Sequence, residues 1–364
     1  MVTIADAKRK RLPTNSSPLP ALHPESPSGR TVWIAVDAMG GDTGPGQIVD
    51  GALAAARHLD LGVILAGPVS RLEDEVSKHP LTDAGRVRFL QSDAVIDMAE
   101  SPVAALRRKP GASIRVAAEC VARGEAAGLF SAGHTGATVM AAHEAFGMLP
   151  GVERPALAAT IPTRDRPAVL LDVGASVECR PQHLLCFGIM GSVYARVAFG
   201  LEAPRVGLLS IGEEATKGNE LTREAHRLLQ GAPLRFIGNV EARDVYSGIA
   251  DVIVSDGFTG NVALKVSEGL VDVMGDLLND ELSSTVTASV GSLLTLRAMR
   301  RFKKRVDYSE FGGAPLLGVS GVAIVGHGRS SAKAVRNAVA MAYRFATSQL
   351  IQRVERELAG AGVA

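Results

Sequence analysis

Residues 31–46 read TVWIAVDAMGGDTGPG, which is an apolar run, an aspartate, and a glycine-rich loop with a proline near its end. The pattern predicts a buried strand up to Asp37, a loop, and a helix that starts near Pro45. The first backbone N–H groups of a helix have no partner within the helix and therefore attract anions. The stretch therefore predicts an anion-binding loop after Asp37, in which Gly40, Gly41, Gly44 and Gly46 leave backbone N–H groups around one point.

The succession of strand, glycine loop and helix recurs along the chain. Apolar runs such as VILAG, VRFL, GLFSAG, AVLLDVG, RVGLLSIG and DVIVSDG alternate with longer helical patterns. These runs lack in/out alternation, which is typical of parallel strands covered by helices on both faces. The sequence therefore predicts a doubly wound α/β fold with a mostly parallel sheet, formed by residues 31–364 as one large domain.

Several predicted strands end in loops of small residues. Because the carboxyl ends of parallel strands lie on one edge of a sheet, we expect these loops to converge there into a binding site. For any single loop, a tight turn explains the glycines equally well. The loops are DAMGGDTGPG at 37–46, SAGHTGA at 131–137, DVGAS at 172–176, SIGEEATKGNE at 210–220 and SDGFTGN at 255–261.

Composition excludes several classes of function. The chain has 364 residues, with 39 Lys and Arg against 38 Asp and Glu, and only 4% aromatic residues, so neither net charge nor stacking rings favour a nucleic-acid partner. The three cysteines have no metal-ligand spacing and are typical of a reducing cytoplasm. Residues 1–30 predict a flexible Pro/Ser-rich tail, and no apolar run is long enough to cross a bilayer.

Four polar residues in the loops are candidates for chemistry, each with a structural alternative. Lys217 would direct a cation to the edge of the sheet, or it pairs as a surface lysine with a nearby glutamate. Asn261 lies at a predicted helix start, where capping is the favoured role. His134 and His327 are equally explained as turn residues. A catalytic thiol, a serine nucleophile elbow, a metal cluster and a nucleotide loop find no specific support.

Residues 282–306 carry the sharpest local charge anomaly. The segment holds six basic residues and no acidic one, and its pattern predicts a basic amphipathic helix inserted into the domain. Such a helix suits an anionic membrane surface, an acidic protein partner, or a solvated domain edge. The apolar side includes Leu294 and Phe302, and the opposite side carries Arg297, Arg300, Arg301 and Lys304.

Several longer strings together resemble the PlsX family of phosphate acyltransferases. They include IAVDAMGGD, SAGHTGA, LLDVGAS, KGNELT, VSDGFTGNVALK and DYSEFGG, and the resemblance runs from about Val32 to about Arg344. Three positions depart from the family's usual pattern. His134 and Ser176 stand where asparagine is common, and HGRSS stands where the family has HGSSD.

The resemblance implies a specific reaction and partners. It implies transfer of a fatty acyl group from acyl carrier protein to inorganic phosphate, which gives acyl phosphate for phospholipid synthesis. It also implies an isopropylmalate-dehydrogenase-like, phosphate-acetyltransferase-like three-layer sandwich, a homodimer, no cofactor or metal, and reversible attachment to the inner face of the cell membrane. The membrane glycerol-3-phosphate acyltransferase is a further expected partner.

The resemblance also assigns roles to residues in the loops. Lys217 and Asn261 are the expected catalytic residues. The expected phosphate or substrate contacts are Asp37, Gly40, Gly41, Asp42, Gly133, His134, Thr135, Gly136 and Ser176. Alternatives remain open: a phosphate acetyltransferase-like enzyme with a coenzyme A thioester, a membrane scaffold that binds a regulatory anion, and a dehydrogenase on the same fold.

Overall fold

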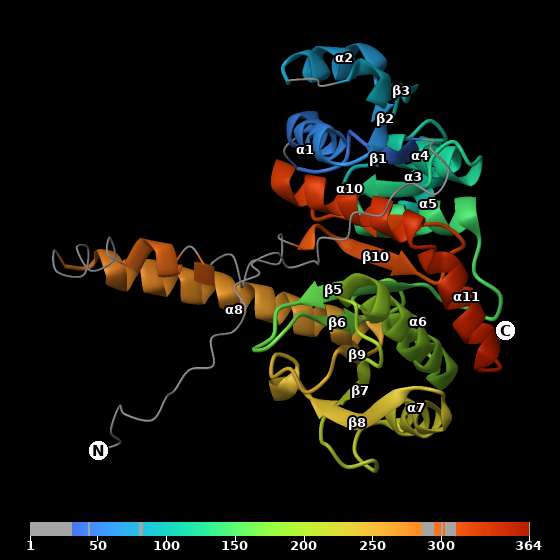
Figure 1. Ribbon diagram of the computed structural model, residues 1–364, viewed down its shortest axis with the longest axis vertical. Coiled ribbons are helices and arrows are strands. Elements are labelled where there is room, and N and C mark those ends of the chain that lie inside the picture. The colour runs from blue at the N-terminus through green and yellow to red at the C-terminus, as the bar shows by residue number, and fades with distance from the viewer. Residues whose placement is uncertain are drawn as a thin grey trace.

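One sheet of eleven strands forms the centre of the molecule (Figure 1). The structure is a computed structural model that describes residues 31–42, 44–79, 83–285, 295–299, 301–302 and 311–363. The strand order is β3-β2-β1-β4-β11-β10-β5-β6-β9-β7-β8. The predicted tail at 1–30 lies outside the described residues.

The first part of the sheet is a parallel set in which β1 to β4 match predicted strands and β11 was not predicted. Its order is β3-β2-β1-β4-β11, with every neighbouring pair parallel. In β1, Ile34 and Val36 point to one face and Ala35 points to the other, and all three are fully buried. The bounds are β1 Val32–Asp37, β2 Leu61–Gly67, β3 Val87–Gln91, β4 Gly128–Ser131 and β11 Ala323–Val325.

A second parallel set, β6-β9-β7-β8, forms the other end of the sheet. Between the two sets lie β5 and β10, and the pairs β11–β10, β10–β5 and β5–β6 are all antiparallel. Three inversions leave the second set pointing opposite to the first. The bounds are β5 Ala156–Ile161, β6 Ala168–Leu171, β7 Arg205–Ser210, β8 Arg235–Glu241, β9 Val252–Val254 and β10 Ala314–Leu317.

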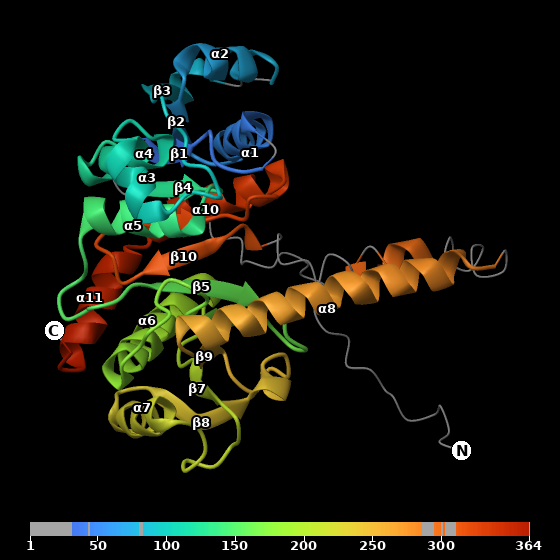
Figure 2. The same cartoon turned by 180° about the vertical axis from the view of Figure 1, so that it is seen from behind.

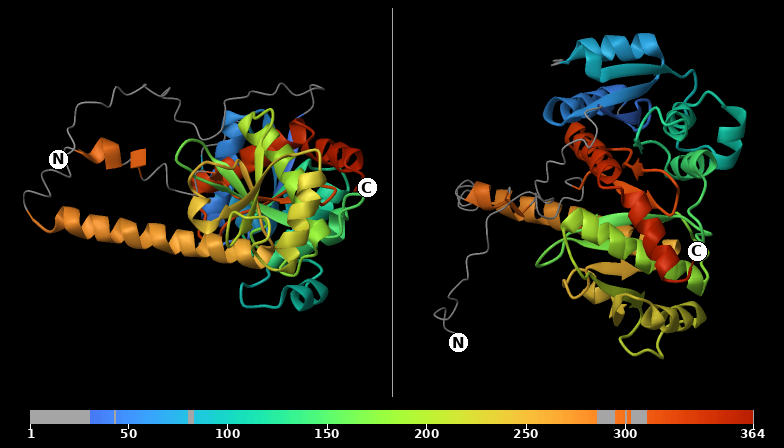
Figure 3. Two further views of the ribbon diagram at one scale, coloured as in Figure 1. Left: turned by 90° about the horizontal axis from the view of Figure 1, so that it is seen from below. Right: turned by 45° about the vertical axis from the view of Figure 1, so that its right-hand side comes forward.

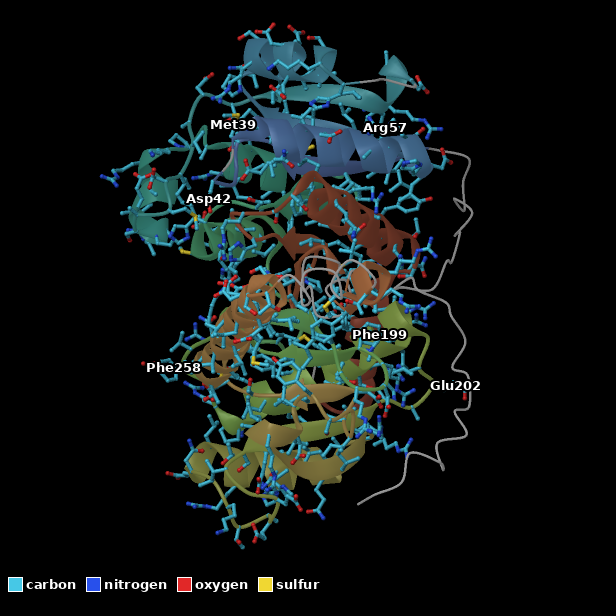
Figure 4. All side chains as sticks on the ribbon, turned by 90° about the vertical axis from the view of Figure 1, so that its left-hand side faces the viewer. Met39, Asp42, Arg57, Phe199, Glu202 and Phe258 are labelled. Atoms are coloured by element: carbon cyan, nitrogen blue, oxygen red, sulfur yellow. The ribbon has the colours of Figure 1, made fainter. Side chains whose placement is uncertain are left out.

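The expectation that all carboxyl ends share one edge is therefore wrong for the sheet as a whole. Sheet twist offsets much of this inversion. Six strand-to-strand steps separate β1 from β9, and at roughly 20–25° a step they rotate the second set by about 120–150°. Loops from both sets can then face the same side of the molecule. Figure 4 shows Asp42, after β1, and Phe258, after β9, on one side, with Arg57 and Phe199 on the opposite side.

Helices cover both faces of the sheet, so the predicted three-layer α/β sandwich is confirmed. One buried cluster joins one face of the sheet to α1, α2, α6, α7, α10 and α11, and a second joins the other face to α3, α4 and α5 (Figures 1 and 2). The bounds are α1 Pro45–His58, α2 Val69–Ser77, α3 Pro102–Arg108, α4 Ser113–Ala122, α5 Thr135–Phe146, α6 Pro181–Phe199, α7 Glu220–Gly231, α10 Ala332–Thr347 and α11 Leu350–Gly360.

Helix α8, Gly257–Ser283, leaves the body of the molecule, as both views of Figure 3 show. Its only buried residues are Gly257 and Gly260, in its first turn. The sequence did not predict this length, because the basic helix was expected to begin at 282, where α8 is about to end. Within the described ranges, no helix is long and apolar enough to cross a membrane.

The predicted basic helix over 282–306 is described only in part. Residues 295–299 and 301–302 are helical, and they include Arg297 and Arg301. Phe302, on the predicted apolar side, has 54% of its surface exposed. Leu294, Arg300 and Lys304 lie outside the described residues. A single continuous helix over 282–306 is not observed, because α8 ends at Ser283.

Candidate active site

A cavity of about 390 Å³ lies where the two parallel sets of strands meet. Its floor comes from the strands at the inversion, with Leu157 and Ala159 on β5, Ala314 on β10 and Val325 on β11. Ligands in open α/β sheets bind where the strand arrangement reverses, because loops diverge there and leave a crevice. The cavity therefore lies at the place where this fold favours a binding site.

Three helices reach this cavity near their N-terminal ends, α5 and α10 with their first turns and α8 with its second turn. Thr135 and Gly136 begin α5, Asn261 lies in the second turn of α8, and Ala334 lies in the first turn of α10. Helix N-termini carry partial positive charge and unpaired N–H groups. The partial positive charge at these helix ends favours an anion in the cavity.

Charged side chains at the rim are Lys265, Glu268 and Arg329, with His327 between them. Lys265 Nζ donates to Glu268 Oε2 at 2.8 Å. Burial lowers the pKa of His327 below its ordinary value, and the charge of Lys265 adds to this shift. His327 is therefore mainly neutral near pH 7.

Asn261 is not a helix cap, so the favoured capping interpretation is wrong. Asp256 takes that role, since its carboxylate accepts from Thr259 N at 2.8 Å and from the Thr259 hydroxyl at 2.7 Å. Asn261 is exposed instead, and its amide lies against Gly174 in the cavity wall. Its side chain is thus available to a ligand.

Asp172 fixes the loop beside Asn261. Its carboxylate is fully buried and accepts four backbone N–H groups, from Leu157 at 2.8 Å and from Gly174, Ala175 and Ser176 at 3.0, 3.0 and 2.7 Å. Burial raises the pKa of Asp172, while these hydrogen bonds lower it. The sequence predicted a loop at 172–176 but not the role of this carboxylate, whose only signal was its place at a strand end.

The loops after β1 and β4 are packed together, as predicted. Ser131 Oγ donates to Asp37 Oδ2 at 2.7 Å, and Gly133 N donates to Ser131 Oγ at 3.1 Å. A Cβ on Gly40 would lie 2.7 Å from Gly133 N, so only glycine permits this approach. Asp37 is buried, and burial raises its pKa.

Not every predicted contact residue lines the cavity. Thr135, Gly136 and Asn261 do. Asp37, Gly40, Gly41, Asp42 and Gly133 lie in the packed loops beside it. His134 caps α5, with Nδ1 accepting from Ala137 N at 3.4 Å, and the buried Ser176 hydroxyl donates to Pro155 O at 2.7 Å.

Lys217 also lies outside the cavity lining. It is exposed on the loop between β7 and α7, and no carboxylate of the described residues is within ion-pair distance of it. The surface pairing with Glu213, Glu214 or Glu220 that the sequence left open is therefore absent from this part of the chain. Because β7 runs parallel to β9, its loop shares the edge from which α8 starts.

Burial disfavours the thiolate form of the three cysteines. Cys120, Cys179 and Cys186 are free, and burial raises the pKa of each thiol to about 11. A thiol needs a depressed pKa to be a good nucleophile near neutral pH. These environments agree with the sequence, which offered no specific support for a catalytic cysteine.

Comparison with known proteins decides the family. The model of a family described as "Fatty acid synthesis protein" matches residues 32–353. The chain belongs to this family. A member from Nitratidesulfovibrio vulgaris, named phosphate acyltransferase, is 50% identical over 322 residues, which cover 88% of this chain and 93% of the relative. Another with the same name, from Pelotomaculum thermopropionicum, is 46% identical over 334 residues, covering 90% of this chain and 97% of the relative.

Solved structures place this family member among a known group of folds. A phosphotransacetylase from Streptococcus pyogenes aligns with a TM-score of 0.60 and 17% identity, covering 89% of this chain and 95% of that chain. The EutD phosphotransacetylase from Staphylococcus aureus aligns with a TM-score of 0.56 and 16% identity, covering 88% and 95%. At these identities the likeness concerns the fold. With the family established, the protein is an acyltransferase of fatty acid synthesis.

Proposed function

We propose that this protein transfers a long-chain fatty acyl group from acyl carrier protein to inorganic phosphate and releases acyl phosphate. The observation that carries the proposal is that the first turns of α5 and α10 and the second turn of α8 meet at one cavity. Such a cavity favours a small multivalent anion. The printed name of the relatives, phosphate acyltransferase, supports phosphate as that anion.

The cavity also offers apolar surface to an acyl chain. Leu157, Val325 and Phe311 are buried side chains of its lining, and Leu264 adds to them from α8. An apolar wall with a few polar groups at one end is the usual form of a site for an amphipathic ligand. The thioester carbon would lie at the boundary between these two regions.

The chemistry proposed is a direct attack of phosphate on the thioester. A phosphate oxygen bonds to the carbonyl carbon, the C–S bond breaks, and the proton of HPO₄²⁻ ends on the leaving sulfur. No strong base is needed, so the protein must position the dianion and stabilise the oxyanion that develops on the carbonyl. Asn261 is our candidate oxyanion donor. Lys217, near the same edge, is the candidate for a cation that approaches when substrates bind.

The physiological setting follows the same proposal. We propose that acyl phosphate serves phosphatidic acid synthesis in the cytoplasm, at the inner face of the cell membrane and beside the membrane glycerol-3-phosphate acyltransferase. We further propose a homodimer. An exposed apolar stripe along α8, at the spacing of a helix–helix contact, supports it; the stripe contains Val262, Val266, Leu270, Val273 and Leu277.

One assay tests the reaction directly. Purified protein is incubated with long-chain acyl carrier protein thioester, with and without inorganic phosphate, and both acyl phosphate and free thiol are measured. Equal amounts of the two, only when phosphate is present, are expected. Thiol release without acyl phosphate would indicate a thioesterase, and no reaction would reject the function. A preference for the coenzyme A thioester would favour the phosphate acetyltransferase-like alternative.

A further inference from the structure

The two cations at the rim of the cavity are in different electrostatic states. Lys265 is held by Glu268 one turn further along α8, with 2.8 Å between Nζ and Oε2. This pairing neutralises most of the charge that Lys265 would present to a ligand. The guanidinium of Arg329 has no carboxylate within ion-pair distance among the described residues. Arg329 therefore provides the uncompensated positive charge of this rim.

The backbone around Arg329 is fixed even though its side chain is exposed. Arg329 N donates to His327 Nδ1 at 3.2 Å, and His327 N donates to Ser330 Oγ at 3.1 Å. The next residue but one, Ser331, caps α10. On the other side, Asp42 N donates to Gly328 O at 2.8 Å, which ties this turn to the glycine loop after β1. The Arg329 side chain thus extends from a turn whose backbone is held by hydrogen bonds.

The chemistry of this arrangement is specific for a phosphate group. A guanidinium presents a planar set of donors that matches two phosphate oxygens, and the N-terminus of α10 adds its partial positive charge beside it. We infer that Arg329 binds a phosphate group of the substrates in this cavity. The inference rests on the proposed function, since both the phosphate acceptor and the phosphopantetheine arm of a carrier-bound donor present this chemistry.

Arg329→Ala tests the inference by steady-state kinetics. Loss of one charge-assisted contact is expected to raise the KM for one substrate by about 10- to 100-fold. The value of kcat should change much less, because a contact made equally in the ground and transition states affects binding alone. Arg329→Lys should recover part of the loss, since lysine keeps the positive charge but lacks the planar set of donors of a guanidinium. Arg353→Ala, at an exposed arginine of α11, is the matched control and should leave KM unchanged.

Comparison of the KM values for the two substrates identifies which of them carries the phosphate group that Arg329 binds. A rise in the KM for inorganic phosphate assigns Arg329 to the acceptor. A rise confined to the KM for the acyl carrier protein donor assigns Arg329 to the phosphate of the pantetheine arm. In that case an acyl-N-acetylcysteamine thioester, which lacks phosphate, should be turned over equally by wild type and variant. Unchanged KM values for both substrates would overturn the inference.

A binding measurement separates failure of this inference from failure of the proposed function. Calorimetric titration with inorganic phosphate alone should show weaker binding to Arg329→Ala than to wild type if the acceptor is the ligand. That result would stand even if wild type made no acyl phosphate. An active wild type with identical phosphate and donor affinities in the variant would instead reject Arg329 and leave the proposed function intact.

Discussion

Asn261 owes its availability to a residue five positions earlier. Because Asp256 caps α8 by accepting from Thr259 N, the amide of Asn261 has no capping role and faces the cavity wall at Gly174. Sequence spacing correctly predicted a helix start here but not which polar residue would cap it. Asp256 and Asn261 are both residue types that cap helices, and only the exact start of the helix decides between them.

The role of Asn261 leads to the first prediction. Asn261→Ala should lower kcat by about 10²- to 10³-fold, as loss of an oxyanion donor typically does, while the free energy of unfolding stays close to that of wild type. Asn279→Ala, at an exposed position of the same helix, is the matched control and should keep full activity. Near-normal turnover in Asn261→Ala would remove this residue from the mechanism.

Asp37 gives a prediction about pH. Burial raises its pKa in the folded protein, so between the unfolded and folded pKa values the folded state binds more protons. Stability from this group is fully present below an ordinary carboxyl pKa of about 4 and is lost as pH rises through the higher folded pKa. Asp37→Asn should therefore reduce the loss of unfolding free energy between mildly acidic and neutral pH.

Urea unfolding over this pH range measures the effect. The amide oxygen can still accept from Ser131, so the packed loops should persist, and Asp276→Asn on the exposed face of α8 provides the control. The pKa of Asp172 is also raised, so part of the pH dependence of the unfolding free energy will remain in Asp37→Asn. An unaltered pH slope in Asp37→Asn would contradict a raised pKa at this site.

At the scale of elements, the start of α8 is the critical contact of the site. Gly257 and Gly260 allow the helix to approach Asp172, and the helix in turn carries Asn261 and Lys265 to the cavity. The sequence predicted the strands and loops before this helix but not its length. Exposed apolar residues continue along it, and nothing in a single sequence distinguishes a buried helix face from one left without a partner in the monomer.

A pair of glycine substitutions tests this contact. A Cβ on Gly260 would lie 1.9 Å from the carbonyl oxygen of Asp172, whereas a Cβ on Gly269 would meet nothing within 4 Å. Gly260→Ala should lower the free energy of unfolding by about 1–3 kcal/mol and reduce activity. Gly269→Ala should leave it unchanged or raise it by up to about 1 kcal/mol, through helix propensity. Equal stability of the two variants, measured by denaturant unfolding, would contradict the tight approach.

At the scale of the molecule, the basic segment at 282–306 predicts attachment to anionic membranes. Each basic residue near such a surface contributes on the order of 1 kcal/mol, and salt screens the attraction. Wild type should bind vesicles that contain anionic lipid in a salt-sensitive manner, and replacement of Arg300, Arg301 and Lys304 by glutamate should abolish binding. The measurement is co-sedimentation with vesicles.

A control with the same change in charge separates the segment from net charge. Replacement of the exposed Arg223, Arg353 and Arg356 by glutamate should leave vesicle binding largely intact. Equal loss in both triple variants would mean that overall charge, and not this segment, attracts the membrane. Unchanged binding in the first variant would reject the docking role.

The sequence predicted the local elements better than their arrangement. Apolar runs and glycine loops correctly indicated the strands from β1 to β4 and from β6 to β9, because each signal lies within a few residues. The antiparallel β5 and β10 were missed, and so was β11; Ala156–Ile161 and Ala314–Leu317 differ little from the parallel strands beside them. The pairing of β10 with β5, which forms part of the cavity floor, joins Leu316 to Leu157 and leaves no local signal in the sequence.

The central position of β10 has a consequence for synthesis of the chain. Residues 314–325 supply the two strands that fill the space between β4 and β5. Until the ribosome has released this last part of the chain, β4 and β5 each present an unpaired edge to other nascent chains. Residues 314–325 thus close two open sheets into one, and a chain truncated before them would be prone to edge-to-edge aggregation.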